Sequence, residues 1–446
     1  MSQRTSSLRP DSCPATSRRG FLRRSALLAA AGPLWLSARL HGAEAPGNRV
    51  RVGAMGTSRN QIGGDGRGTH LAKQLAAIPG VEVAYVCDVD RGNVEKAIAS
   101  VTENQDRRPK GATDFRRILD DESIDALVIA TPDHWHAPAA IAACAAGKHV
   151  YVEKPCSHNA REALWLVEAA RKHQRIVQHG TQRRSWPAIR EAIAKLHDGV
   201  IGRVLAGRSW YFNDRPSIGR GKPAPVPDWL DWDQWQGPAP RVPYRDNVVH
   251  YNWHWFWHWG TGEVGNNGVH TIDVVRWGLG ADAPRRVTSG GGRYRYDDDQ
   301  ETPDTNVVTF DCGDRTITWE GRSWGKRAPW SPENEIAFYG EEGTLAIHGG
   351  GYHVYDPEGR EIDKGGGRGG DVDHLTNFVD AIRAGGSPNA EIAEGAKSVM
   401  FCHLANIAYR TGHTIDYDGR QQQIVDDAET MKLWGREYEE GWRPVF

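Results

Sequence analysis

Cysteine is scarce in this chain of 446 residues, which has only six. No two of them are spaced as Cys-x-x-Cys, and the five beyond residue 45 are scattered and odd in number: Cys87, Cys144, Cys156, Cys312 and Cys402. This distribution argues against a disulfide framework and against a structural zinc site. We predict buried thiols that pack as small apolar groups.

The chain also lacks a strong excess of charge of either sign. Its formal net charge is -2, and without the first 45 residues 48 basic and 55 acidic residues remain, a net charge of -7. A mildly acidic protein offers no electrostatic footprint for nucleic acid or for an anionic membrane. We therefore expect neither partner.

The apolar stretch at residues 26–36 is too short to span a bilayer comfortably and contains Pro33. It follows Ser17-Arg18-Arg19-Gly20-Phe21-Leu22-Arg23, which matches the twin-arginine export pattern, and it precedes the small residues around Ala43-Glu44-Ala45. We predict a twin-arginine signal peptide over residues 1–45 and a periplasmic protein without a stable membrane anchor. The alternative is a disordered basic tail.

From residue 46 onward, short apolar runs alternate with helical stretches, which is typical of a parallel, doubly wound α/β sheet. We expect a Rossmann domain over residues 46–172 that binds NAD or NADP. Strands are expected at residues 50–55, 81–88, 125–131, 149–152 and 176–179. Helices are expected at residues 71–78, 93–100, 138–146 and 160–173.

After about Gly180, tryptophan becomes dense and alternating strands dominate, which predicts an α+β domain with a large, mainly antiparallel open sheet over residues 173–364. We expect this domain to bind substrate and, through its open face, to form homo-oligomers. Its strands are expected at residues 204–212, 286–296, 305–312, 315–324, 335–339 and 344–348. A glycine-rich linker at 365–370, helices within 371–412 that pack back on the core, and a coil tail over 413–446 complete the expected organisation.

The loop after the first expected strand carries an irregular glycine pattern. It begins Gly56-Thr57-Ser58, with serine where a second glycine usually admits a pyrophosphate, and it resumes at Gly66-Arg67-Gly68 after an inserted segment. Asp88, which ends the second strand, is placed to bind the ribose hydroxyls and to repel a 2′-phosphate. This favours NAD over NADP, although Arg91 softens the preference. A glycine-rich loop of no function is the alternative.

The third clear strand leads into Thr131-Pro132-Asp133-His134-Trp135-His136, another loop expected to line a nucleotide cleft. Thr131, Pro132 and His136 are candidate cofactor contacts. The alternative is that Thr131 and Asp133 cap a helix while the histidines only pack.

The tripeptide Glu153-Lys154-Pro155 follows the fourth expected strand. A lysine just beyond the carboxyl end of a strand can face a nicotinamide ring and stabilise an alkoxide that forms on a substrate carbon. Glu153 and Lys154 are therefore candidate cofactor and catalytic residues. A surface ion pair followed by a turn is the alternative.

Tryptophan and histidine alternate in Trp253-His254-Trp255-Phe256-Trp257-His258-Trp259. If this segment is extended, its four tryptophans share one face and suit stacking on sugar rings. We take Trp257 and His258, together with Asn267 and Gln182, as candidate substrate-binding residues; a buried aromatic core is the alternative. His250, His254, His258 and His270 lack a compact metal-binding signature, so we predict no metal.

Taken together, these features resemble the glucose–fructose oxidoreductase, inositol dehydrogenase and MocA family (Gfo/Idh/MocA) from about Val50 to about Thr411. The resemblance rests on Glu153-Lys154-Pro155, on the strand that ends at Asp88, and on the segment from Asn266 to Asp273. It implies that Lys154 is the catalytic lysine and His270 the catalytic histidine.

The family's aspartate four residues before that histidine is Asn266 here. An amide can orient a substrate hydroxyl but cannot act as a base. We therefore expect Asp273 to compensate as a further catalytic residue.

The resemblance implies hydride transfer between NAD(P) and a secondary hydroxyl of a sugar, polyol or glycoside. His270 would accept the hydroxyl proton and Lys154 would bind the alkoxide. Three alternatives remain at this point: a redox-neutral NAD-dependent glycosidase or lyase that acts through a transient keto-sugar, a non-catalytic carbohydrate-binding member, and a metal-dependent hydrolase.

Overall fold

The computed structural model describes residues 49–58, 64–325 and 334–445. The expected signal peptide and most of the insertion in the glycine loop lie outside these residues. No helix in the described part of the chain has the length and apolar character needed to cross a bilayer. The residues from Val50 onward form one unit, to which the following description applies.

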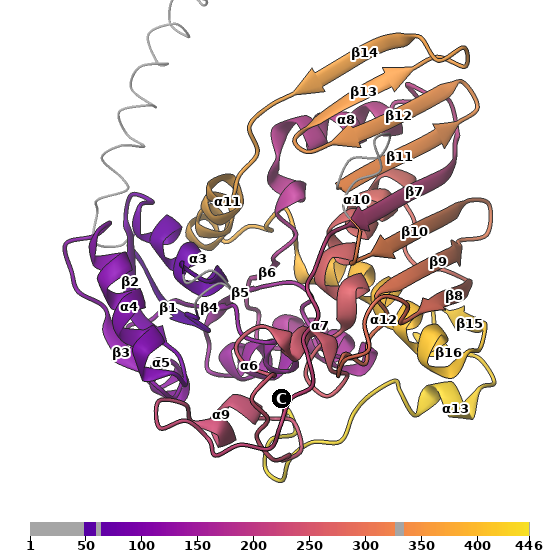
Figure 1. The fold of residues 1–446 in the computed structure, drawn as a ribbon. Helices are drawn as coiled ribbons and strands as arrows, with labels where there is room; N and C mark the ends of the chain where they lie inside the picture. Colours follow the sequence, from indigo (N-terminus) through magenta and orange to yellow (C-terminus); the bar gives the residue numbers. More distant parts are fainter. Residues whose placement is uncertain (1–48, 59–63, 326–333, 446) are drawn as a thin grey trace, which may run out of the picture. The chain divides into compact units, whose positions relative to one another are not determined.

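The N-terminal half forms a parallel sheet of six strands in the order β3-β2-β1-β4-β5-β6 (Figure 1). This order confirms the expected Rossmann fold and places the topological switch point between β1 and β4. The strands are β1 (Val50–Met55), β2 (Val81–Cys87), β3 (Lys110–Ala112), β4 (Ala126–Ile129), β5 (His149–Val152) and β6 (Val177–His179). The short strand β3 was missed because three residues carry too little periodicity to be recognised.

Helices cover both faces of this sheet: α3 (Arg67–Ala76), α4 (Arg91–Thr102), α5 (Arg116–Leu119), α6 (Asp133–Ala145) and α7 (Ala160–Lys172). Helix α6 begins at Asp133 instead of Pro138, so the histidines expected in a loop lie on its first turn. The C-terminal helix α11 (Asp371–Ala384) returns to pack against α3. Its Leu375 and Phe378 share one apolar core with Leu71 of α3.

The second sheet has ten strands in the order β14-β13-β12-β11-β7-β10-β9-β8-β15-β16. Only β7 and β10 pair in parallel, which confirms the expected, mainly antiparallel sheet. The strands are β7 (Val204–Phe212), β8 (Arg286–Gly292), β9 (Thr305–Asp311), β10 (Thr316–Arg322), β11 (Asn334–Gly340), β12 (Gly343–His348), β13 (Gly351–Tyr355), β14 (Glu361–Gly366), β15 (Ile415–Asp418) and β16 (Gln423–Ile424).

Two expectations for this half were wrong. The supposed glycine-rich linker begins inside β14, and the supposed coil tail contains β15, β16 and the short helix α13 (Ala428–Met431). Strand β15 has few apolar residues of its own and is stabilised by pairing with β8, about 130 residues earlier. Such a long-range partner leaves no local signal in the sequence.

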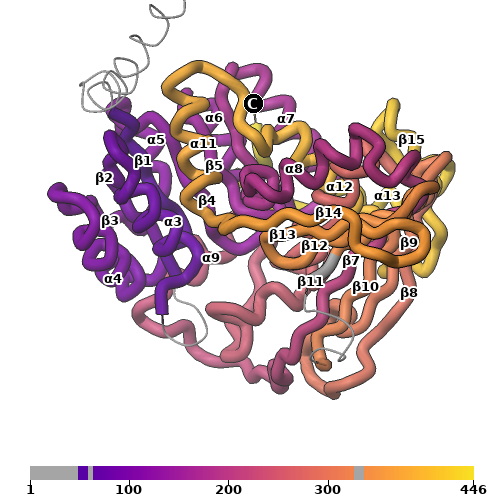
Figure 2. Tube along the Cα trace, turned by 90° about the horizontal axis from the view of Figure 1, so that it is seen from above, coloured from indigo at the N-terminus to yellow at the C-terminus, as the bar shows by residue number. Residues whose placement is uncertain are grey.

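Helices α8 (Pro187–His197) and α12 (Ile392–Thr411) cover one face of the large sheet (Figure 2). Helix α10 (Val269–Leu279) packs against β7 and β11 of the same sheet. Helix α10 approaches closely because β7 has a glycine at the contact: a Cβ at Gly207 would lie 2.4 Å from Val275. The opposite face exposes alternate side chains of the strands, among them Val307 and Tyr339.

The tryptophan-rich segment is not extended, so the expected face of four tryptophans does not exist. Residues Asn252–Trp255 form a 3-10 turn, and Trp253, Trp255 and Trp259 are buried. Trp259 packs edge-on against Trp232 and Trp235 at 5.8 and 5.3 Å. Burial of these large apolar rings outweighs the alternating pattern, and the alternative of an aromatic core is confirmed.

Residues 213–250, which we call the strap, run from β7 across the end of the Rossmann sheet and include helix α9 (Trp232–Gln236). The strap pairs with the chain just after β2: Arg91 N donates to Trp229 O at 3.3 Å, and Asp231 N donates to Val89 O at 3.1 Å. The second domain therefore contacts the Rossmann domain one and three residues beyond Asp88.

Candidate active site

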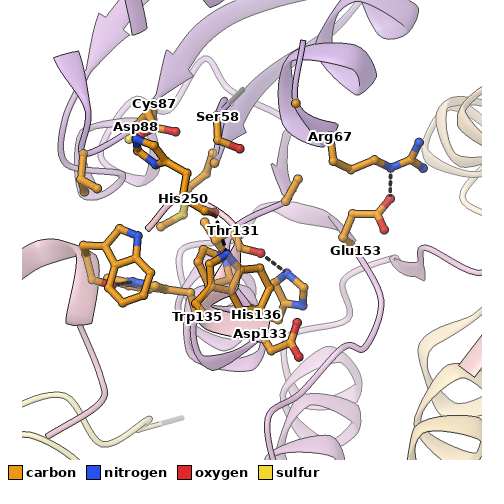
Figure 3. A pocket seen from close by; sticks show the side chains of 18 of the residues that line it. Ser58, Arg67, Cys87, Asp88, Thr131, Asp133, Trp135, His136, Glu153 and His250 are labelled. Carbon is orange, nitrogen blue, oxygen red and sulfur yellow. Dashed lines mark hydrogen bonds and ion pairs between the residues drawn. The ribbon is translucent and has the colours of Figure 1, made fainter. Parts of the chain in front are cut away.

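A cavity of about 350 Å³ lies at the carboxyl edge of the parallel sheet, where the strand order reverses. In Figure 3, Asp88 and His250 lie at one end of this cavity, and Arg67 and Glu153 lie at the other. Ten of the twelve residues predicted to bind the cofactor line it: Gly56, Ser58, Gly66, Arg67, Asp88, Thr131, Pro132, His136, Glu153 and Lys154.

The other two predicted residues, Thr57 and Gly68, lie directly behind the cavity wall. Thr57 is buried and its carbonyl accepts a hydrogen bond from Thr69 Oγ1 at 3.0 Å. A Cβ at Gly68 would lie 2.2 Å from the carbonyl oxygen of Gly56, so this glycine allows helix α3 to pack against the loop. Both residues therefore stabilise the conformation of the loop without lining the cavity.

The irregular glycine loop has the features needed to hold a dinucleotide. Gly56 has a φ of +84°, and a Cβ there would lie 2.6 Å from the backbone of Ala130 and Thr131. The loop leads into α3, whose first N–H groups are available to an anion. The buried hydroxyls of Thr57 and Thr131 have no hydrogen-bond partner in the described residues. Free donors and a tight backbone turn at a switch point fit a pyrophosphate.

Asp88 stands at the ribose end of this cavity. Its Oδ1 accepts the N–H of Asp90 at 2.9 Å, and burial raises the pKa of Asp88 to about 7. A carboxyl group with this pKa is partly protonated at neutral pH while the cavity holds no ribose. Because ribose hydroxyls donate to an ionised carboxylate, dinucleotide binding favours loss of this proton.

We therefore expect NAD to bind more tightly as the pH rises. Below its pKa of about 7, Asp88 must lose a proton before it can accept both ribose hydroxyls, so the dissociation constant should fall about tenfold between about pH 6 and about pH 8. Calorimetric titration of the nucleotide-free protein measures this change. The variant Asp88→Asn should bind NAD more weakly and show no such dependence; a pH-independent affinity in the wild type would contradict the prediction.

Glu153 is held in one orientation by a chain of charges. Its Oε1 accepts Arg67 Nε at 2.7 Å and Gln182 Nε2 at 3.4 Å. The same guanidinium donates two further bonds, of 2.7 and 2.8 Å, to Asp371 at the start of α11. The predicted residues Arg67, Glu153 and Gln182 are thus brought together, and the C-terminal part of the chain fixes them.

Lys154 reaches across to the second domain. Its Nζ donates to the carbonyl oxygen and to Oδ1 of Asn266 at 2.8 and 2.9 Å. Asn266 lies in a π-helical turn (Val264–Gly268) that continues into α10. His270 is four residues further along this continuous helix and therefore projects from the same face.

The charge of Lys154 affects the protonation of His270. Burial lowers the pKa of Lys154, although Glu153 and Asp133 oppose the shift, and no described carboxylate lies within 4.0 Å of its Nζ. Burial and the charge of Lys154 lower the pKa of His270 well below its usual value. No described residue makes a hydrogen bond to the His270 ring. A neutral, half-buried imidazole is thus free to accept a proton beside an ammonium group.

His136 braces the loop that carries Lys154. Its Nδ1 lies 2.6 Å from the carbonyl of Pro155, and its Nε2 lies 2.8 Å from the carbonyl of Thr131. The ring therefore connects the end of β4 to the loop after β5. Asp133, one turn earlier on the helix, is buried and accepts a hydrogen bond from Thr261 Oγ1 at 2.6 Å.

The structure does not support a catalytic role for Asp273. Its carboxylate is completely buried and bonds Arg184 Nε and Nη2 at 2.9 Å and Ser398 Oγ at 2.6 Å. Burial alone would raise the pKa of Asp273, but the facing guanidinium holds it below its usual range. Both oxygens are engaged in joining α10 to α12 and to the turn Gln182–Ser185, so Asp273 cannot compensate for Asn266.

Trp257 and His258 are not part of this cavity either, so their predicted role at the Lys154 site is corrected. Both line a separate cavity, and His258 Nε2 donates to the carbonyl of Pro240 at 2.8 Å. Asn267 does not line the cavity either. It follows Asn266, the partner of Lys154, and its Nδ2 donates to Glu263 at 2.9 Å, which in turn pairs with Arg215 at 3.0 Å.

Sequence reasoning missed the residues that the second domain adds to the cavity: Gln234, Trp235, His250, Tyr251, Trp253 and His254. The two histidines were considered only as metal ligands, although their position beside an aromatic run was a signal for a binding site. Within the described residues, no group of three or more His, Cys, Asp or Glu side chains has a geometry that could hold a metal.

Comparison with known proteins agrees with this architecture. The Gfo/Idh/MocA profile described as an oxidoreductase family with an NAD-binding Rossmann fold matches residues 51–181, and its C-terminal α/β domain matches residues 200–311. A glycosyl hydrolase family 109 protein of Saccharopolyspora erythraea is 34% identical over 170 residues. That match spans 37% of this chain and only 35% of the relative.

Solved structures extend the likeness to most of the chain. A levoglucosan dehydrogenase in complex with NADH and levoglucosan has 18% identity and a TM-score of 0.63, covering 85% of this chain and 100% of that one. The WlbA dehydrogenase of Bordetella pertussis, in complex with NADH and UDP-GlcNAcA, has 19% identity and a TM-score of 0.60, covering 83% and 99%. At these identities the likeness shows the fold. The two profile matches, the strand orders of both sheets and the dinucleotide cavity show that the chain belongs to the Gfo/Idh/MocA oxidoreductase family, with an NAD-binding Rossmann domain.

Proposed function

We propose that the protein transfers a hydride between NAD and a secondary hydroxyl of a sugar, polyol or glycoside. The observation that carries this proposal is the contact of Lys154 Nζ with Asn266 at 2.8 and 2.9 Å, one helical turn before His270. Lys154 lines the NAD cavity, whereas His270 does not line it but lies close enough for the charge of Lys154 to lower its pKa.

In this mechanism His270 accepts the proton of the substrate hydroxyl. The low pKa of His270 keeps the ring neutral, as a proton acceptor must be. Lys154 donates a hydrogen bond to the same oxygen as negative charge develops on it, and Asn266 holds the ammonium in place. Bound NAD supplies the acceptor for the hydride that leaves the carbon.

The proposed substrate class rests on two kinds of support. Polar side chains that can bond hydroxyls lie near the Lys154 contact: Tyr251 lines the cavity, Gln182 donates to the neighbouring Glu153, and Asn267 directly follows Asn266. In addition, the two dehydrogenases of the same fold were crystallised with a sugar or a sugar nucleotide. NADP remains possible for this chain only if Asp88 tolerates a 2′-phosphate, which its carboxylate disfavours.

A redox-neutral glycosidase is the second candidate, and two observations favour it. One relative with 34% identity is a glycosyl hydrolase family 109 protein. The strap contributes Gln234 and Trp235 to the cavity and docks beside Asp88, which favours a retained nucleotide. In such a reaction, transient oxidation of one carbinol would acidify a neighbouring C–H, whose proton is lost as the aglycone leaves. Water would then add to the resulting double bond and the hydride would return to the ketone, so no NADH accumulates.

One experiment tests the proposal and separates the two candidates. The purified protein is denatured, and any released nucleotide is identified by mass. The native protein is then incubated with NAD and a panel of sugars, polyols and aryl glycosides. NADH that accumulates with an oxidised sugar supports the dehydrogenase, whereas released aglycone without NADH supports the glycosidase. If neither product forms although sugars bind, the protein is not an enzyme of this kind.

We further propose that the protein is exported by the twin-arginine route to the periplasm and forms a homo-oligomer. The motif Ser17-Arg18-Arg19-Gly20-Phe21-Leu22-Arg23 supports export. The uncovered face of the large sheet, with Val307 and Tyr339 at 51% and 42% exposure, supports self-association. Cell fractionation of an Arg18→Lys, Arg19→Lys variant and sedimentation of the purified protein test these two proposals.

A further inference from the structure

A second cavity, of about 430 Å³, shares no lining residue with the first. The hydrogen bond between Thr261 and Asp133 separates the two, because Thr261 lines the second cavity and Asp133 lines the first. Its walls come from the segment after Lys154, the tryptophan-rich segment, helix α12 and the C-terminal tail. Its volume is that of a site for one small molecule.

Cationic side chains dominate the charged groups of this cavity. Arg410, Lys432 and Arg436 line it, against the single carboxylate of Glu437. Lys432 and Arg436 are already paired outside the cavity, with Glu429 and Glu162, both at 2.7 Å. Arg410 differs from these two because no described carboxylate lies within 4.0 Å of it and its guanidinium stacks on the Trp257 ring, 5.0 Å from the centroid.

This arrangement leaves Arg410 as a charge without a close counterion. Desolvation lowers the pKa of Arg410, although the residue is exposed and the carboxylate of Glu301 opposes the shift. The group nevertheless remains charged at neutral pH. A guanidinium placed over an indole at the edge of a cavity can bind a carboxylate through two parallel hydrogen bonds.

Other polar groups of the lining residues lack partners and indicate which further atoms a ligand carries. Within the described residues, Asn159 Nδ2 and Arg436 Nη1 are buried donors without an acceptor. His158 Nε2 donates to the carbonyl of Trp257 at 2.9 Å, so in the neutral ring Nδ1 is an acceptor, and it too has no partner. Burial lowers the pKa of His158 well below its usual value, which keeps that ring neutral.

We propose that this cavity is a second binding site, for a small hydroxylated carboxylate the size of one sugar acid. Arg410 binds the carboxylate, and a hydroxyl of the ligand donates to His158. Asn406 supports the assignment, because its Nδ2 is used by the carbonyl of Thr261 at 2.8 Å and its Oδ1 remains available to a second hydroxyl. The ligand thus needs both acceptor oxygens and O–H donors, which a simple anion such as chloride lacks.

Calorimetry with D-glucuronate and D-glucose, on NAD-saturated protein, tests this site. Glucuronate is expected to bind, and glucose, which lacks the carboxylate, to bind about tenfold more weakly or not at all. The variant Arg410→Gln should weaken glucuronate about tenfold. Arg420→Gln is the matched control, because that exposed arginine lies outside this cavity, and it should leave binding unchanged.

A Lys154→Ala variant distinguishes this site from the active site. Glucuronate binding that persists in Lys154→Ala and falls in Arg410→Gln supports the proposal, whatever the outcome for the proposed hydride transfer. Binding that disappears in Lys154→Ala but survives in Arg410→Gln, equal binding of glucose, or no binding of glucuronate would each overturn it. Thermal melting of all variants confirms that they are folded.

Discussion

Replacing Lys154 with alanine is expected to lower kcat about 10³-fold while NAD binds with unchanged affinity. The ammonium contacts Asn266 and stands at the end of the cavity, so its removal takes away the hydrogen bond to the developing alkoxide. A loss of this size corresponds to about 4 kcal/mol of transition-state stabilisation. Steady-state kinetics with a substrate found in the sugar panel measure kcat, and calorimetry measures NAD binding.

The matched control is Lys96→Ala, because Lys96 is an exposed lysine of α4. It should keep full activity. His270→Ala should lower kcat about 10²- to 10⁴-fold, which is the usual contribution of a general base. Because both groups act on one oxygen, the kcat of the double variant should be only slightly lower than the kcat of the less active single variant. Near-normal turnover in Lys154→Ala would disprove the assignment.

The Rossmann half was predictable because its signals are local. Strands such as Ala126–Ile129 are buried on both faces and therefore appear as short, continuous apolar runs. Glu153 and Lys154 follow one of these runs directly, so the strand fixes their place at the carboxyl edge of the sheet. The irregular glycine loop was likewise recognisable from its position between a strand and a helix.

The other side of the site was not predictable in the same way. The strap reaches the cavity because Trp229 and Asp231 bond the backbone beside Val89, a contact over about 140 residues that no local pattern encodes. The prediction that the tryptophan-rich segment is extended was wrong, because the same alternation of residues with a period of two is found here around a 3-10 turn.

Asp273 illustrates a further limit. Asp273 lies three residues after His270, about one turn further along α10. This spacing alone cannot tell whether its carboxylate faces a substrate or a buried arginine. The partner that decides the matter, Arg184, lies 89 residues earlier in a turn of its own. Only the folded structure brings the two together.

Replacing Asp273 with asparagine is accordingly expected to destabilise the fold. The substitution keeps the shape of the side chain but leaves the buried guanidinium of Arg184, with 5% of its side chain exposed, with only the more distant carboxylate of Glu394, at 3.7 Å, as a counterion. The free energy of unfolding should fall by about 3 kcal/mol, within the range for a broken buried ion pair. Urea denaturation followed by tryptophan fluorescence measures the change.

The pH dependence of this effect distinguishes an ion pair from other causes of instability. Because the pKa of Asp273 is lowered in the folded protein, the pair stabilises the fold above the carboxyl group's unfolded pKa of about 4 and loses its effect as the pH falls through the lower, folded value. The difference in the free energy of unfolding between wild type and Asp273→Asn should therefore become smaller at acidic pH. Asp106→Asn, at an exposed aspartate, should show no gap at neutral pH. An Asp273→Asn protein with wild-type stability but without turnover would instead restore Asp273 to the catalytic machinery.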